Sequence, residues 1–360
     1  MIHPIDSNSV TGGYNNKTGN PMNDDRALFE TGLLRESTRQ RLIEVLGADT
    51  ITRLQQRSDL HGAMAVAKCW IAISMLLASA WLAMDQLGYW SIPVVTLCLL
   101  FLGGRILALA ILTHEGAHRT LFANGKLNDT VTHWLCAAPV YLDLIKYRHH
   151  HAQHHIHTGT EKDVDLPLIE GFPTTKPSLI RKFIRDFTGQ TGLKSVIGLA
   201  MMNAELIRWN VTGVVEKLDR DDWGKLRHLR AFLVNSRRTL IFHSVFFAAA
   251  FSLNLTELFA LWWASYLFTY PFCIRVRAIA EHAVTERTGD MLKNTRTTRA
   301  GVIARALFAP CHVNFHIEHH ALVSVPFWQL PELHRLMQEH KITPVPPSYW
   351  QVLKTASSAQ

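Results

Sequence analysis

Apolar residues are concentrated in two stretches of the chain that contain no lysine or arginine. One stretch lies between Lys68 and Arg105 and the other between Arg238 and Arg275, and each has one acidic residue near its middle. A helix needs roughly 20 residues to cross the hydrocarbon core of a membrane. Each stretch therefore predicts two membrane-spanning helices joined by a tight turn. The expected spans cover about residues 67–84, 91–113, 239–254 and 257–274.

The distribution of charge predicts how these spans are oriented. Both turns lack basic residues, whereas the segment between the two hairpins is rich in lysine and arginine. By the positive-inside rule, both ends of the chain and the central segment face the cytoplasm. The alternative is a pair of buried helical hairpins inside a soluble protein. The length and pairing of the apolar stretches favour the membrane.

The remaining segments give the domain organisation. Residues 1–26 are rich in Asn, Gly, Ser and Asp and predict a flexible leader. Residues 27–64 carry an amphipathic helical pattern, which predicts a cytoplasmic helix region. Residues 65–345 form one membrane domain, and residues 346–360 form a C-terminal tail. The predicted fold class is therefore all-α and integral to the membrane, with four spans in two hairpins and a cytoplasmic helical cap.

The composition excludes several other classes of protein. The 360 residues are 48% apolar and 18% charged, which is too apolar for a disordered chain. Five cysteines without a Cys-x-x-Cys motif exclude a disulfide scaffold and a cysteine-based zinc module. The net charge of +8 follows from the membrane topology, and no base-reading module accompanies it. Nucleic acid is therefore not an expected partner.

Nine of the 20 histidines gather at the cytoplasmic ends of predicted helices, in three short motifs and one outlier. The motifs are His-x-x-x-His and two copies of His-x-x-His-His. The candidate metal ligands are His114, His118, His151, His154, His155, His316, His319, His320 and the outlier His282. A spacing of four residues puts two imidazoles on one face of a helix. Because one ion accepts at most about six ligands, nine imidazoles indicate two metals.

The first motif also matches a different class of enzyme. His114-Glu115-x-x-His118 has the spacing of a zinc-protease helix, in which Glu115 would be the general base. That interpretation leaves seven of the nine histidines without a purpose. An intramembrane zinc protease and a non-catalytic metal-binding membrane protein remain as alternatives.

The three motifs together resemble the membrane fatty acid desaturase and hydroxylase superfamily, over about residues 67–340. Several flanking residues match as well, namely Arg148, Thr158, Asn314 and His334. The resemblance implies a non-haem di-iron site built from the nine histidines in the cytoplasmic cap, with O2 as co-substrate. It also implies a lipid or fatty acid substrate. His282 looks like the additional ligand that the family places between the last span and the third motif.

The resemblance leaves the reaction open. Desaturation is the first expectation, and oxidative decarboxylation of free fatty acids to terminal alkenes and hydroxylation are the alternatives. The chain lacks the His-Pro-Gly-Gly motif of a fused cytochrome b5 domain, so electrons are expected from an external reductase and a carrier such as a ferredoxin. This departure favours a bacterial inner membrane.

Two further features remain open. Ala278 stands where acyl-CoA desaturases carry an asparagine, so the coordination of the second metal is expected to differ there. The basic residues Arg181, Lys182 and Arg185 either contact a carboxylate or phosphate head group or form a solvated, lipid-facing surface.

Overall fold

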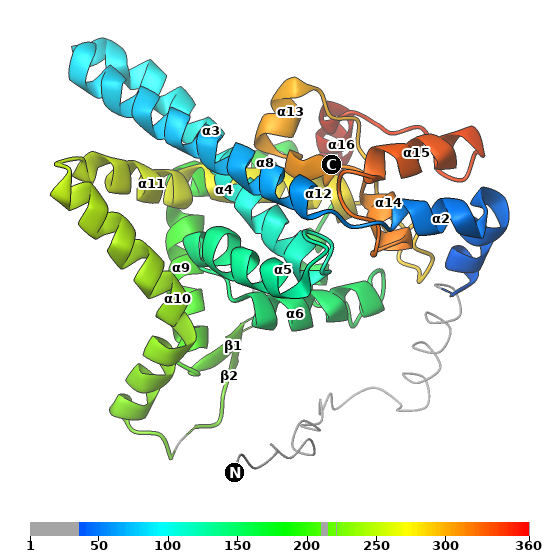
Figure 1. Cartoon of the computed structure of the whole chain (residues 1–360), viewed down its shortest axis with the longest axis horizontal. Coiled ribbons are helices and arrows are strands. Elements are labelled where there is room, and N and C mark those ends of the chain that lie inside the picture. The colour runs from blue at the N-terminus through cyan, green and yellow to red at the C-terminus, as the bar shows by residue number, and fades with distance from the viewer. Residues whose placement is uncertain (1–35, 210–214, 221, 360) are drawn as a thin grey trace.

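Two long helices form the first predicted hairpin. In the computed structural model, which describes residues 36–209, 215–220 and 222–359, α3 (Asp59–Gln86) and α4 (Ser91–Ala117) pack along each other (Figure 1). Ser58 begins the hairpin because its side chain accepts a hydrogen bond from the backbone of His61. The segments 59–86 and 88–117 are long and apolar enough to cross a membrane.

The rest of the chain is also mostly helical. The remaining helices are, in chain order, α2 (Ala48–Leu54), α5 (Gly125–Val131), α6 (Leu144–His157), α7 (Leu166–Ile169), α8 (Lys176–Phe187), α9 (Gln190–Asn203), α10 (Lys225–Ser252), α11 (Thr256–Phe268), α12 (Tyr270–His282), α13 (Val302–Leu307), α14 (His316–Ala321), α15 (Leu330–Glu339) and α16 (Tyr349–Ala356). Short 3₁₀ and π-helical segments are η1 (Gly88–Trp90), η2 (Thr132–Ala137), η3 (Ala138–Val140) and η4 (Pro310–His312).

The second predicted hairpin is built differently from the first. The third predicted span, residues 239–254, lies mainly in the C-terminal half of α10, whose N-terminal turns carry Lys225 and Arg227. The fourth, residues 257–274, includes most of α11 and the first residues of α12. These two helices are separated at Thr269, and Pro271 occupies the first turn of α12, where its missing N–H is tolerated. The four-span arrangement therefore stays a prediction.

The structure contains a two-stranded antiparallel sheet that the all-α prediction does not include. β1 (Ile207–Trp209) pairs with β2 (Val215–Lys217), with Ile207 opposite Lys217. Three-residue strands are too short to show the alternation of apolar and polar residues by which a strand is recognised. The described part of the chain is therefore mostly helical, with this one small sheet added to the predicted all-α fold.

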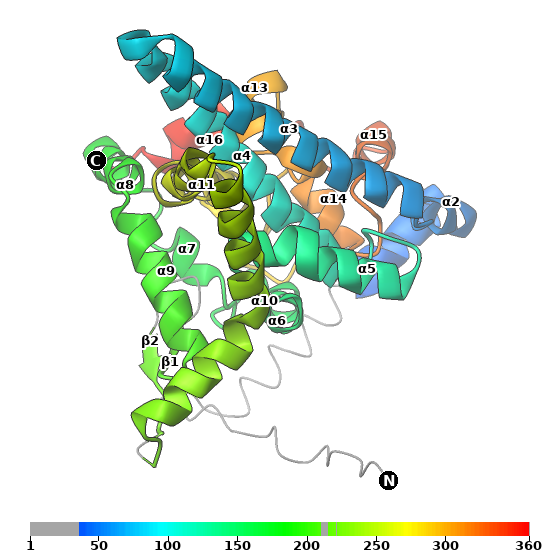
Figure 2. The ribbon, with the colours of Figure 1, turned by 60° about the vertical axis from the view of Figure 1, so that its left-hand side comes forward.

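The helix α4 lies at the centre of the molecule. It contacts α3, α6, α11 and α12, and Figure 2 shows it between α3 and the α10–α11 pair. Most side chains of its C-terminal half are buried. This helix therefore carries its last residues into the middle of the helices that pack around it.

Both ends of the described chain dock on this body. Residues 36–46 are helical, and Leu42 and Leu54 are fully buried in the main core, so the predicted amphipathic region packs on the protein. The predicted tail contains α16, in which Val352 is buried against Leu179 and its neighbours. The predicted leader, residues 1–26, lies outside the described residues.

Candidate metal centre

Four helices bring the nine predicted histidines together in two groups. The first group is His114, His118, His151, His155 and His319, and the second is His154, His282, His316 and His320. Within each group, one nitrogen from every ring lies within 4.8 Å of the others. Metal–imidazole bonds are about 2.0–2.1 Å long, so nitrogens on opposite sides of one ion lie about 4.2 Å apart. Each group is therefore close to the size of a single coordination sphere.

The faces of two helices decide which group each ring joins. On α6, His151 and His155 are one turn apart and face the first group, whereas His154 faces the second. On α14 (His316–Ala321) the middle histidine, His319, joins the first group and the other two join the second. Each His-x-x-His-His motif thus contributes to both groups. The motif on α6 gives two rings to the first group and one to the second, and the motif on α14 gives one ring to the first group and two to the second.

Several ring nitrogens in this centre are buried and lack a hydrogen-bond partner. Among the described residues they include His114 Nε2, His118 Nε2, His155 Nδ1, His316 Nδ1 and both nitrogens of His320. Other rings meet at close range, with 2.9 Å between His151 Nε2 and His155 Nε2 and 2.8 Å between His282 Nε2 and His316 Nε2. A buried polar atom without a partner is costly. A metal ion in each group would supply a partner to one nitrogen of every ring, so the donor set fits two ions.

The electrostatics keep most of these rings neutral, which is the form that binds metal. Burial lowers the pKa of five rings well below the usual range, and the neighbouring histidines lower it further: His151, His155, His316, His319 and His320. Burial also lowers the pKa of His154, but the negative charges of Asp165 and Asp163 outweigh burial and raise it.

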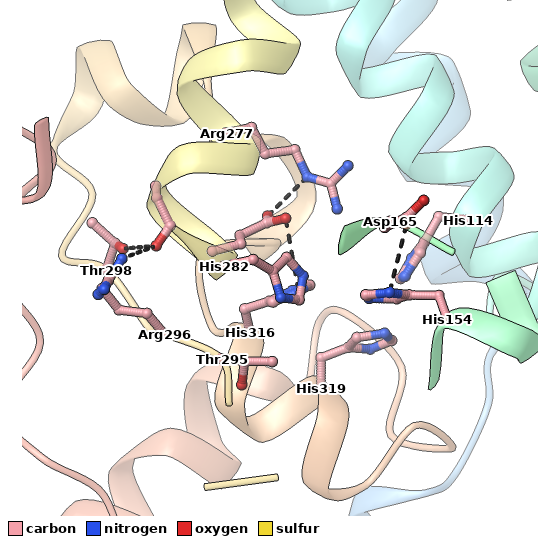
Figure 3. Close-up of polar contacts among 12 residues, drawn as sticks. His114, His154, Asp165, Arg277, His282, Thr295, Arg296, Thr298, His316 and His319 are labelled. Atoms are coloured by element: carbon pink, nitrogen blue, oxygen red, sulfur yellow. Dashed lines mark hydrogen bonds and ion pairs between the residues drawn. The ribbon is translucent and has the colours of Figure 1, made fainter. Parts of the chain in front are cut away.

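Carboxylates lie next to the second group, and Figure 3 shows one of them, Asp165, beside His154. Asp163 Oδ1 accepts a hydrogen bond from His154 Nδ1 at 2.8 Å, and Asp165 Oδ2 lies 3.6 Å from the same nitrogen. Glu281 is buried, accepts a hydrogen bond from Arg277 at 2.8 Å, and has its other oxygen 3.7 Å from His316 Nε2. Burial raises the pKa of Glu281 to about 7. A carboxylate that accepts a hydrogen bond from a metal-binding ring, as Asp163 does, fixes the orientation of that ring.

Two further buried glutamates hold the histidine helices in place. Glu115 Oε1 lies 3.2 Å from His114 Nδ1, and Glu115 Oε2 accepts hydrogen bonds from the Thr120 hydroxyl and from the backbone N–H of Phe327. Glu318, on α14, accepts hydrogen bonds from His334 and Thr297. Both oxygens of Glu115 are thus engaged in positioning. A zinc-protease base would instead present its carboxylate to the metal-bound water.

The flanking residues of the motifs connect the helices that carry them. Arg148 donates hydrogen bonds to the last carbonyls of α4, at Gly116 and Ala117, and to Asp129. Gly116 also allows Thr132 of η2 to lie close to α4, because a Cβ at this position would lie 2.2 Å from the Thr132 hydroxyl. Asn314 donates to the carbonyl of Thr298 and thereby holds the segment before α14.

The motif spacing identified the rings but not the groups around them. It missed the positioning residues Asp163, Asp165, Glu281 and Glu318 and the ring of Tyr147, which stacks on His151 with 5.4 Å between centroids. An available signal is the pair of aspartates shortly after the second motif. His149, His150 and His312, which lie in or beside the motifs, belong to neither group.

Comparison with known proteins identifies the family of this chain. The sequence model of the fatty acid desaturase family matches residues 90–352, a segment that contains all nine histidines. The chain belongs to the fatty acid desaturase family. This membership makes it an enzyme of the oxidoreductase class.

Two curated relatives of this desaturase-family chain are themselves named desaturases. It is 25% identical to dihydrorhizobitoxine desaturase of Bradyrhizobium elkanii over 287 residues, which cover 78% of this chain and 76% of the relative. It is 22% identical to sn-1 oleoyl-lipid 12-desaturase of a Synechocystis strain over 291 residues, 76% of this chain and 77% of the relative. The two names share a reaction type and differ in substrate.

Proposed function

We propose that this chain is an oxygen-dependent oxidoreductase that uses two iron ions to introduce a double bond into a fatty acid or fatty acyl chain. The observation that carries the proposal is the convergence of nine histidines in groups of five and four. The names of both relatives favour desaturation. Decarboxylation and hydroxylation start from the same hydrogen abstraction and are the other outcomes of the product experiment.

The chain's own residues have defined tasks in this proposal. The five-histidine group would hold one iron and the four-histidine group the other. When bound, the two irons would supply the reduction of O2 and the removal of hydrogen from an unactivated C–H bond, chemistry that side-chain acids and bases do not provide. Asp163 would keep His154 of the second group oriented, and Glu115 would do so for His114 of the first.

The membrane arrangement belongs to the same proposal. We infer four spans, with both ends of the chain and the histidines on the cytoplasmic side of a bacterial inner membrane. Electrons would come from a separate reductase and a carrier such as a ferredoxin. Alkaline phosphatase fused after residue 88 or residue 254 is expected to be active and after residue 160 inactive; activity at residue 160 would reverse the orientation.

Metal analysis and product analysis test the proposal directly. The purified protein is expected to contain about two irons per chain. Cells that express it and are fed a saturated fatty acid are expected to yield, by gas chromatography, a product with an internal double bond. An alkene one carbon shorter would assign decarboxylation and a hydroxy acid would assign hydroxylation. One zinc and no iron would reject the di-iron proposal.

The variant Glu115→Gln separates this proposal from a zinc protease. The glutamine keeps the shape of the buried side chain, so iron is expected to remain bound and activity to fall by about tenfold, the lower range for partners of metal ligands. A zinc protease would lose its general base and with it all peptide hydrolysis. Iron content and product yield, measured on the same preparation, distinguish the two results.

A further inference from the structure

A cavity of about 330 Å³ lies beside the second histidine group, between η3, α7, α8, α9, α11 and α12. Tyr270, Ile274 and Ala278 line it at four-residue spacing along α12, and His282 follows four residues later on the same helix. Leu168, on α7, lies three residues after Asp165. Two walls of the cavity thus begin beside the four-histidine group.

Most of the side chains that line the cavity are apolar, but three basic residues line it as well. Lys182 on α8, Lys194 on α9 and Arg275 on α12 line it, together with one exposed acidic residue, Glu170. Arg275 is neutralised, because its guanidinium donates to both carboxylate oxygens of the buried Asp186, at 2.6 and 2.7 Å.

The two lysines are in a different situation from Arg275. Within the described part of the chain, neither has a carboxylate within ion-pair distance. Lys182 is half-buried, and its ammonium lies 5.8 Å from the centre of the Phe172 ring. Lys194 is exposed. A largely apolar cavity whose lining includes two such ammonium groups suits an amphiphile with an anionic head.

The outer surface next to the cavity is apolar. α8 exposes Ile180, Ile184 and Phe187 at helical spacing, and α9 exposes Leu193 and Ile197. Helices with an exposed apolar stripe and basic residues lie at membrane interfaces. The two helices that carry the lysines are therefore suited to the membrane surface, where the head group of an amphiphile resides.

We propose that this cavity takes the acyl chain of the substrate and that Lys182 and Lys194 bind its anionic head group, either the carboxylate of a free fatty acid or the phosphate of a lipid. The assignment rests on the proposed function, because it makes the cavity the approach to the two irons. It also separates the basic residues of α8: Lys182 contacts the ligand, and Arg181, which does not line the cavity, belongs to the surface.

Ligand binding to the purified full-length protein tests the assignment. Radiolabelled oleate, its methyl ester and dioleoyl phosphatidate are titrated under argon without reductant, so that no turnover occurs. The double variant Lys182→Gln/Lys194→Gln is expected to weaken binding of the preferred acid by about tenfold, since hydrogen bonds to charged groups are stronger than those between neutral groups. Methyl oleate should bind the variant and the wild type equally. Whichever acid shows the tenfold loss identifies the head group.

Two variants complete the experiment. Arg181→Gln removes one positive charge from the same helix outside the cavity and is expected to leave all Kd values unchanged. Ile274→Trp fills the cavity and is expected to abolish binding of acid and ester alike. Equal loss of acid and ester in the lysine variant, an equal loss in Arg181→Gln, or intact binding in a folded Ile274→Trp protein would overturn the assignment.

The outcome is separable from that of the proposed function. Charge-dependent binding without an oxidised product would leave the cavity assigned and reject the reaction. Formation of an oxidised product from a substrate whose binding does not depend on the two lysines would support the reaction and reject the cavity assignment.

Discussion

Replacing His151 by alanine is expected to abolish product formation and to lower the iron content of the purified protein to about one ion per chain or less. The His151 ring belongs to the five-histidine group, with Nε2 2.9 Å from His155 Nε2 and its centroid 4.4 Å from that of His114. Its loss leaves an incomplete site and a cavity beside Tyr147, which stacks on it. Iron analysis and product yield, measured on one preparation, report both effects.

The same helix offers matched controls for this variant. His149 is exposed and belongs to neither group, so His149→Ala is expected to retain two irons and activity close to that of the wild type. His150→Ala is expected to be intermediate, because His150 Nε2 donates to Asp165 at 3.0 Å and Asp165 in turn lies beside His154. Complete loss of iron in His149→Ala would show that the ligands of this run have been misassigned.

The second large effect is expected at a residue that the motifs do not contain. Asp163 is buried and accepts a hydrogen bond from His154 Nδ1, which leaves the other ring nitrogen for the metal. Removing such a partner typically lowers metal affinity or activity by about 10–100-fold. Asp163→Ala is therefore expected to release iron from the four-histidine group at a correspondingly lower chelator concentration.

Chelator titration of the purified protein measures this release. Asp163→Asn keeps an oxygen acceptor in place and is expected to lose less affinity than Asp163→Ala. Glu161→Ala removes a carboxylate from an exposed position of the same segment and should leave the titration unchanged. A titration of Asp163→Ala that matches the wild type would contradict the role of this carboxylate in orienting His154.

Much of the metal centre could be predicted from the sequence, because the relevant patterns lie within short segments of the chain. Helical spacing places His114 and His118 on one face of α4, and the apolar run before them predicts the long helix that carries them. The number of imidazoles exceeds the capacity of one ion, which predicts two groups. These conclusions need only the period of a helix and the chemistry of imidazole.

The helix boundaries in the second apolar stretch could not be predicted in this way. Its composition predicts a pair of spans, yet α10 begins 14 residues before the predicted start at residue 239, and α11 ends at Phe268. The break at Thr269 follows from local backbone geometry next to Pro271. A hydropathy average is taken over about 20 residues, so it does not detect a break in the helix at one residue.

The sequence by itself thus determined which nine rings gather, the helices that carry them and the apolar hairpin beneath them, because helical periodicity and hydropathy act over neighbouring residues. The tertiary structure decided that the rings form one group of five and one group of four, and it decided which carboxylates lie beside them. His154 and His155 are adjacent in the chain but belong to different groups. The faces they meet are set by the packing of α4, α12 and α14, which are distant in sequence and whose contacts no local pattern encodes.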